Sequence, residues 1–151
     1  MGRRYTGIGS AASGANKTVL NLISATTIRP ALYDMVIGSV ATPADAAVKW
    51  HVQRTTAVGT EGSGYTPVAL DPGDPASLAD YGVGAYSVEP TFTANAVLLQ
   101  ISMNQRNTFR WVAAPGGELI APATANNGLG CQTTAVSTGT TAYEVVMFHE
   151  E

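Results

Sequence analysis

Apolar and polar residues alternate along several segments of the chain with the period of two that a β-strand imposes. The clearest case is residues 48–54, where Val48, Trp50 and Val52 point to one side and polar side chains point to the other. The same alternation predicts a strand at residues 97–103, with four residues facing inward: Val97, Leu99, Ile101 and Met103. The spacing indicates half-buried antiparallel strands.

Other apolar segments, separated by Gly, Pro and Asn-Gly turn signals, predict further strands at residues 18–23, 29–40, 109–113, 118–121, 129–135 and 143–149. Within residues 29–40, the side chains of Leu32, Val36 and Val40 are expected to share one face. Near the end of the chain, Tyr143 and its alternate neighbours Val145 and Met147 are expected to do the same. Eight or nine short strands without a helix of ordinary length predict an all-β fold, a jelly-roll-like antiparallel β-sandwich.

Two segments interrupt this strand pattern. Residues 1–16 are small and polar with scattered glycines, which predicts an extended N-terminal arm and leaves residues 17–151 as a single β-sandwich domain. Residues 57–85 are rich in Gly and Pro and predict one long irregular loop. Loops longer than about 12–15 residues are uncommon and are usually functional, so this loop is a candidate contact region.

Composition adds one informative feature, a low content of charged residues. Only 13% of the 151 residues are charged, and the net charge is −3, against a usual charged share of about 25%. A free monomer usually keeps itself soluble with mixed surface charge, so this surface is expected to be covered by partners. The negative net charge argues against nucleic acid as a partner.

No apolar segment is long enough to span a membrane, since a membrane-spanning helix needs about 20 apolar residues. A membrane is therefore not expected as a partner. Arg3 and Arg4 start the chain like a signal peptide, but the required apolar core does not follow. We therefore expect the protein to be made and used in the cytoplasm, or in an assembly formed there.

Few side chains are able to do covalent or metal chemistry. The chain has one cysteine, Cys131, and two histidines, His51 and His149. A zinc site needs three or four ligands at characteristic spacing, and a free cysteine in a strand usually acts as a small buried apolar side chain. We therefore predict no catalytic residue, no cofactor and no metal. A hydrolase would require Cys131 to lie beside a histidine in a cleft.

The carboxylates of Asp71 and Asp74 lie close together in the sequence Asp-Pro-Gly-Asp-Pro. Calcium would need several oxygen ligands at alternating positions, whereas Pro72 and Pro75 are typical of a turn. We interpret this segment as structural.

Arg106 and Arg110 flank the aromatic residues Phe109 and Trp111. Such a cluster can stack on single-stranded nucleic acid, but two arginines on an acidic chain give little support for that function. We expect the arginines to form forked bonds to carboxylates instead, either to Glu118 across the Pro-Gly-Gly turn or to an acid on another subunit.

The order of these segments resembles the capsid decoration (cement) proteins of tailed phages. The resemblance spans nearly the whole chain and consists of turn and strand signatures. The matching segments are Tyr5-Thr6-Gly7, Arg54-Thr55-Thr56, residues 66–75, Glu89-Pro90-Thr91, residues 110–118, Pro122 with Asn126-Asn127-Gly128, and Glu150-Glu151.

This resemblance implies a non-catalytic virion protein with a jelly-roll-like fold that forms a homotrimer. It would bind the outside of an assembled phage head and clamp neighbouring major capsid proteins, after assembly in the cytoplasm of the bacterial host. We expect the capsid or subunit interfaces to contain Arg3, Arg4, Tyr5, Ile8, Tyr65, Asp71, Asp74, Arg106, Arg110, Trp111 and Glu118.

An alternative is a receptor- or glycan-binding domain of a phage head or tail fibre, a class that is also often trimeric and rich in β-strands. This hypothesis predicts exposed aromatic side chains clustered at one end of the molecule. Its candidates in the long loop are Tyr65, Tyr81 and Tyr86.

Overall fold

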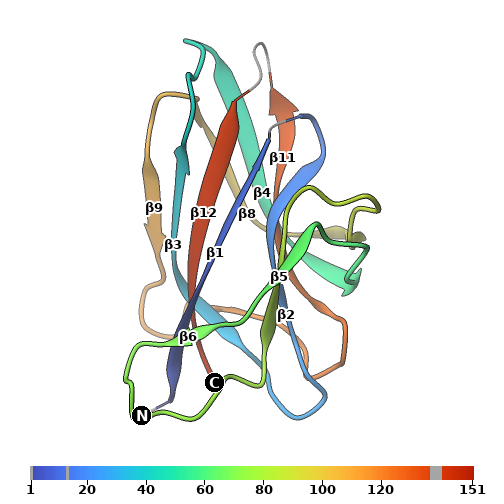
Figure 1. The fold of residues 1–151 in the computed structure, drawn as a ribbon, viewed down its shortest axis with the longest axis vertical. Coiled ribbons are helices and arrows are strands. Elements are labelled where there is room, and N and C mark those ends of the chain that lie inside the picture. The colour runs from blue at the N-terminus through green and yellow to red at the C-terminus, as the bar shows by residue number, and fades with distance from the viewer. Residues whose placement is uncertain (1, 13, 137–140) are drawn as a thin grey trace.

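The computed structural model describes residues 2–12, 14–136 and 141–151. Two six-stranded antiparallel sheets pack face to face (Figure 1), and the predicted all-β antiparallel β-sandwich is confirmed. Within these residues the chain forms no helix long and apolar enough to cross a membrane.

The first sheet, sheet A, has the strand order β10-β3-β12-β1-β6, and β9 also pairs with β3. Its strands are β1 (Arg4–Ala12), β3 (Ala31–Ser39), β6 (Val68–Ala69), β9 (Phe109–Val112), β10 (Leu119–Ile120) and β12 (Ala142–Glu150). The second sheet, sheet B, has the order β5-β7-β2-β11-β4-β8. Its strands are β2 (Lys17–Ile23), β4 (Ala47–Ala57), β5 (Ser63–Tyr65), β7 (Asp80–Val83), β8 (Thr91–Asn104) and β11 (Gly128–Val136).

The pairing of four pairs of strands is nested. β1 pairs with β12, β2 with β11, β3 with β9, and β4 with β8, so the first half of the chain pairs with the second half in reverse order. This arrangement brings the two ends of the chain to the same end of the sandwich (Figure 1). There the backbone N–H of Arg3 donates to the carbonyl of Glu151 at 3.1 Å, and the N–H of Glu151 donates back to Arg3 at 2.9 Å.

The core lies between the sheets and follows the predicted alternation in both of its central strands. In β4, the side chains of Val48, Trp50 and Val52 are buried as expected, and β12 buries Tyr143 together with its alternate neighbours. Trp50 from sheet B meets Tyr143 from sheet A edge to face, with ring centroids 4.9 Å apart. Such aromatic pairs contribute about 0.5–1.5 kcal/mol beyond the burial of their area.

The N-terminal segment differs from the expected extended arm. Residues Arg4–Ala12 form β1, which pairs along its length with β12 and at one end with β6, so most of residues 1–16 belongs to the sandwich. The glycines have a packing function here, because a Cβ on Gly7 would lie 2.2 Å from the ring of Tyr81. The small inward face of β1 makes room for large side chains of sheet B. Residues 1 and 13 of the expected arm lie outside the described residues.

Two register shifts change the side of the sheet on which individual side chains lie, compared with the prediction. In β3, a shift in the pairing with β12 lies between Leu32 and Asp34, so Leu32 and Met35 are both buried while Val40 is 54% exposed. In β8, a shift in the pairing with β4 turns Val97 outward, and its side chain is 41% exposed. A bulge adds a residue to one strand and reverses the parity of every position beyond it.

The expected irregular loop at residues 57–85 is also corrected. Three short strands, β5, β6 and β7, lie within it, and β6 joins sheet A while the other two extend sheet B. Tyr81 on β7 is fully buried and hydrogen-bonds to the last strand, β12. The segment therefore forms one edge of each sheet, β6 in sheet A and β5 in sheet B.

Candidate functional site

Two adjoining surface hollows lie beside the paired chain ends. The first has a volume of about 440 Å³ and is lined by Gly2, Arg3, Arg4, Leu70, Asp71 and Asp74. The second has a volume of about 490 Å³ and is lined by Arg4, Ala31, Tyr33, Val112, Ala113, Pro115, Glu118 and Glu150. Arg4 lines both, so we call them together the terminal hollows. They bring together five predicted interface residues from three distant segments: Arg3, Arg4, Asp71, Asp74 and Glu118.

Arg4 occupies the centre of the terminal hollows. Its Nε donates to Glu150 Oε2 at 3.1 Å, and its guanidinium carbon lies 5.3 Å from the centroid of the Tyr33 ring. About half of the Arg4 side chain is exposed. An ion pair at such an exposed position contributes only about 0–1 kcal/mol to stability. The pair therefore leaves the guanidinium accessible to a partner at little cost to the fold.

The acidic residues at the rims form local turns. Asp71 Oδ1 accepts a hydrogen bond from the N–H of Gly73 at 2.8 Å, and the Asp71 carbonyl accepts one from the N–H of Asp74 at 3.0 Å. Glu118 Oε1 accepts from the N–H of Gly116 at 3.2 Å. Each carboxylate thus shapes its own loop, and the hollows carry charges of both signs.

A buried polar network lies beside the first hollow and was not predicted. The fully buried ring of His149 lies 2.8 Å (Nδ1) from the hydroxyl of Tyr81 and 3.4 Å (Nε2) from Glu151 Oε1. Because the carboxylate of Glu151 can only accept, we assign the proton of the neutral ring to Nε2, and Nδ1 then accepts from the Tyr81 hydroxyl. Burial lowers the pKa of His149 to about 4, although Glu151 acts in the opposite direction, so the ring is neutral at pH 7.

Glu151 connects this network to the loop before β7. Its carboxylate accepts hydrogen bonds from the hydroxyl of Ser77 and from the N–H groups of Leu78 and Ala79. Burial acts to raise the pKa of Glu151, but these hydrogen bonds outweigh it and lower the pKa. The Ser77 hydroxyl lies 2.5 Å from the carboxylate, so the arrangement fastens the loop to Glu151.

Tyr5 belongs to this buried network. Its side chain is fully buried, its ring stacks on His149 with centroids 5.4 Å apart, and its hydroxyl donates to the carbonyl of Pro75 at 3.0 Å. Tyr5, expected at an interface, is therefore enclosed by the chain itself. A large aromatic residue next to a glycine-rich segment anchors that segment to the core.

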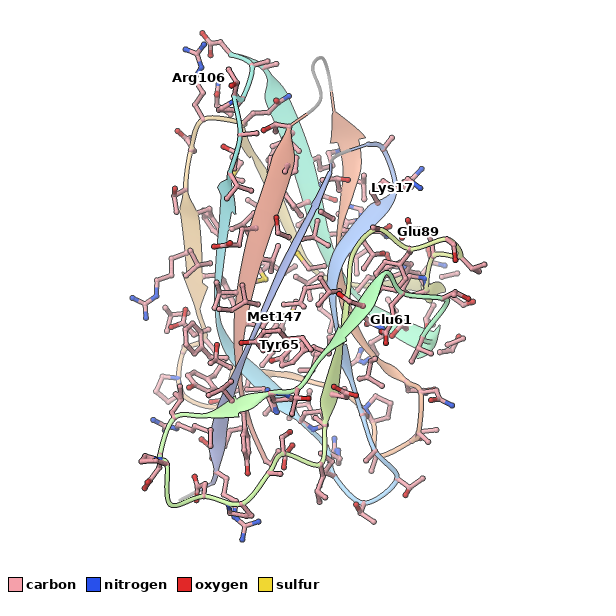
Figure 2. All side chains as sticks on the ribbon, viewed as in Figure 1. Lys17, Glu61, Tyr65, Glu89, Arg106 and Met147 are labelled. Carbon is pink, nitrogen blue, oxygen red and sulfur yellow. The ribbon has the colours of Figure 1, made fainter. Side chains whose placement is uncertain are left out.

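The remaining predicted interface residues are dispersed. Arg106 lies at the end of the molecule opposite the termini, as Figure 2 shows. Ile8 lies on the outer face of sheet A and is 39% exposed, whereas Tyr65 and Trp111 are half-buried and pack against the core. Only part of the predicted set therefore shares one site.

Arg110 forms the expected forked bond with a different partner. Its Nε and Nη2 atoms donate to the carboxylate of Asp34, at 3.0 and 2.5 Å. Asp34 lies on the adjacent strand β3 and is almost fully buried, whereas Glu118 bonds within its own turn. The carboxylate raises the pKa of Arg110, first through the hydrogen bonds and then through its charge.

The outer face of sheet A carries apolar residues from five strands, and the Asp34–Arg110 ion pair lies among them. Ile8 on β1 is aligned with Val146 on β12, which is aligned with Val36 on β3. In a second row, Val68 on β6, Phe148 on β12 and Val112 on β9 alternate with the polar residues Thr6 and Asp34. Val68 and Val112 are exposed at the two edges of the sheet. We call this surface the sheet A face, and it consists of Ile8, Val36, Val68, Val112, Val146 and Phe148.

Most of the residues considered for catalysis or glycan binding are buried. Cys131 is fully buried, and burial raises the pKa of its thiol. Within the part of the chain that the structure describes, no group of His, Cys, Asp and Glu is arranged to hold a metal ion. Tyr81 and Tyr86 are also buried, and Tyr65 is half-buried. The exposed aromatic cluster that a glycan-binding domain required is therefore not formed by these residues.

Comparison with known proteins identifies no relative: no protein-family model matches the chain, and neither a curated protein nor a solved structure matches it.

Proposed function

We propose that this chain is a non-catalytic structural protein of a phage virion, which binds the outside of the assembled head and clamps neighbouring major capsid proteins. The observation that carries the proposal is the sheet A face. Val68 and Val112 are 52% and 57% exposed there, on a chain with only 13% charged residues. An apolar surface of this kind is typical of a protein that works while covered by a partner.

The fold supports the proposal. In the nested order described above, the strands β1-β12-β3-β9 face the strands β2-β11-β4-β8, and this order supports a jelly-roll classification. We propose this finer classification together with the resemblance to decoration proteins. A rigid sandwich of this kind presents the sheet A face and the terminal hollows as preformed surfaces.

The two surfaces would contribute differently to binding. Burial of the sheet A face contributes affinity at about 25 cal/mol per Å² of apolar area removed from water. In the terminal hollows, Arg4 and Asp71 offer charges of opposite sign, which fix orientation more than they add affinity. Engaging two neighbouring capsid proteins at once would raise the overall affinity further through effective concentration.

Co-sedimentation of the full chain with phage heads that lack it tests the proposal. Val68→Glu places a charge in the sheet A face, and Thr56→Glu places the same charge at an exposed position on β4 of sheet B. We expect Val68→Glu to weaken head binding at least about tenfold, which corresponds to about 1.4 kcal/mol, and Thr56→Glu to bind like the original chain. The proposal fails if the original chain does not bind heads, or if both variants bind equally well.

A further inference from the structure

Strand β8 is the long unprotected edge of the molecule. It has 14 residues, and among the strands of the described residues only β4 pairs with it. The strands at the other sheet edges are much shorter, with two to four residues each in β5, β6, β9 and β10. Beyond Val97, therefore, β8 presents a row of backbone N–H and C=O groups on the side away from β4.

Apart from the register shifts at and before Val97, β8 has neither the charged residues nor the proline that usually block such an edge. Between Thr91 and Asn104 there is no charged residue and no proline. Soluble proteins normally protect a long edge strand with Lys, Pro or a covering segment, because an open edge recruits another strand. An edge of this length without protection is expected to be paired in the working protein.

Partly buried apolar side chains of β8 and β9 pack against the core. Leu99 and Met103 on β8 and Phe109 and Trp111 on β9 are only partly buried, although all four pack against the core. The two strands lie at edges of opposite sheets, β8 in sheet B and β9 in sheet A. We call these four residues the β8 seam. The seam combines apolar side chains with the open backbone edge of β8, and this combination favours strand addition from a partner.

We propose that β8 and the β8 seam form the face through which copies of this chain associate. The absence of charge favours an identical copy as the occupant, because association of like molecules brings equivalent residues close together and like charges would repel. Residues 97–103 can therefore lie against the same residues of another copy without repulsion. The inference goes beyond the proposed function, which concerns head binding alone, and adds a surface through which copies of the chain associate.

The oligomeric state of the full chain, measured without phage heads, tests the inference. Sedimentation velocity over about 1–100 μM covers the range of weak to moderate self-association. Ser102→Glu places a charge on β8 opposite Lys49 of β4, and Val97→Glu adds a second charge on the same strand. The control Ser10→Lys places a charge on β1 opposite Glu144 of β12. Each serine substitution gains a cross-strand partner of opposite charge, so both variants are expected to fold.

We expect the original chain and the Ser10→Lys variant to associate equally, and the double β8 variant to have a dissociation constant at least about tenfold higher. Hydrogen exchange gives a second measurement that needs no variant. The amides of residues 97–103 should be more protected in the associated protein than after dilution.

The inference is overturned if the original chain remains monomeric, if the folded double variant associates normally, or if the amides of residues 97–103 gain protection only when heads are added. The last result would assign the edge to a capsid protein. The head-binding assay does not depend on these results, because a chain that associates through another face can still bind heads. Likewise, a chain that associates through β8 but ignores heads would refute only the proposed function.

Discussion

Protonation of His149 is expected to destabilise the fold in mildly acidic solution. The ring is buried and neutral, with a pKa of about 4 in the folded protein against 6.5 in a free histidine. Between these pH values the unfolded chain binds more protons at this residue than the folded chain, so stability falls as the pH falls. Each unit of pKa difference corresponds to about 1.36 kcal/mol, so acidification from neutral pH to pH 4 removes about 3 kcal/mol.

The loss is large relative to a total stability of about 5–15 kcal/mol for a domain. The measurement is the free energy of unfolding in urea, determined at several values between about pH 4 and pH 7.5. His149→Phe is the comparison variant, because it keeps a planar ring beside Tyr5 but cannot be protonated. Tyr81 then retains an acceptor, since its hydroxyl also lies 3.4 Å from the carbonyl of Met147.

We expect the original chain to lose about 3 kcal/mol more than His149→Phe across this range. Other carboxylates titrate in both proteins, so most of their contribution cancels in the difference. Glu151, whose folded pKa is lowered, contributes stability that is lost only as the pH falls below its ordinary value of 4.5. Parallel curves for the two proteins would refute the reasoning, because they would show that His149 titrates normally in the fold.

Three further predictions follow from the packing. Deleting residues 1–16 removes the buried strand β1, so the remaining chain should show no cooperative unfolding transition by circular dichroism. Gly7→Ala places a Cβ 2.2 Å from the Tyr81 ring and should lower the free energy of unfolding by about 1–3 kcal/mol, whereas Gly38→Ala, with its nearest atom at 3.5 Å, should change it much less. A thiol reagent should modify Cys131 at least about a hundredfold more slowly in the native protein than in denaturant; rapid native labelling would contradict its burial.

The strand pattern could be predicted from the sequence wherever alternation runs without interruption. Val48, Trp50 and Val52 are all buried as their spacing indicated. The bulges that turn Val40 and Val97 outward could not be predicted, because the register of a strand depends on a partner far away in the sequence.

The candidate site was predicted only in part, and for a related reason. The alternation that buries Tyr143, Val145 and Met147 continues to His149, so its burial could have been inferred from the same spacing. Its partners could not, because Tyr81 is 68 residues away in the chain. The glycine-rich N-terminus was misleading because small residues are typical both of a free arm and of a strand packed beneath a large ring.

The nested strand pairing also determines the order in which the fold can form. β1 and β2 have their longest-range partners in β12 and β11, so these contacts wait until the last strands have left the ribosome. Chains dominated by such distant contacts close large loops before they gain stabilising energy, and they fold slowly. During synthesis the early strands remain exposed to aggregation, so this protein is expected to depend on release of the finished chain, or on chaperones, to reach its native state.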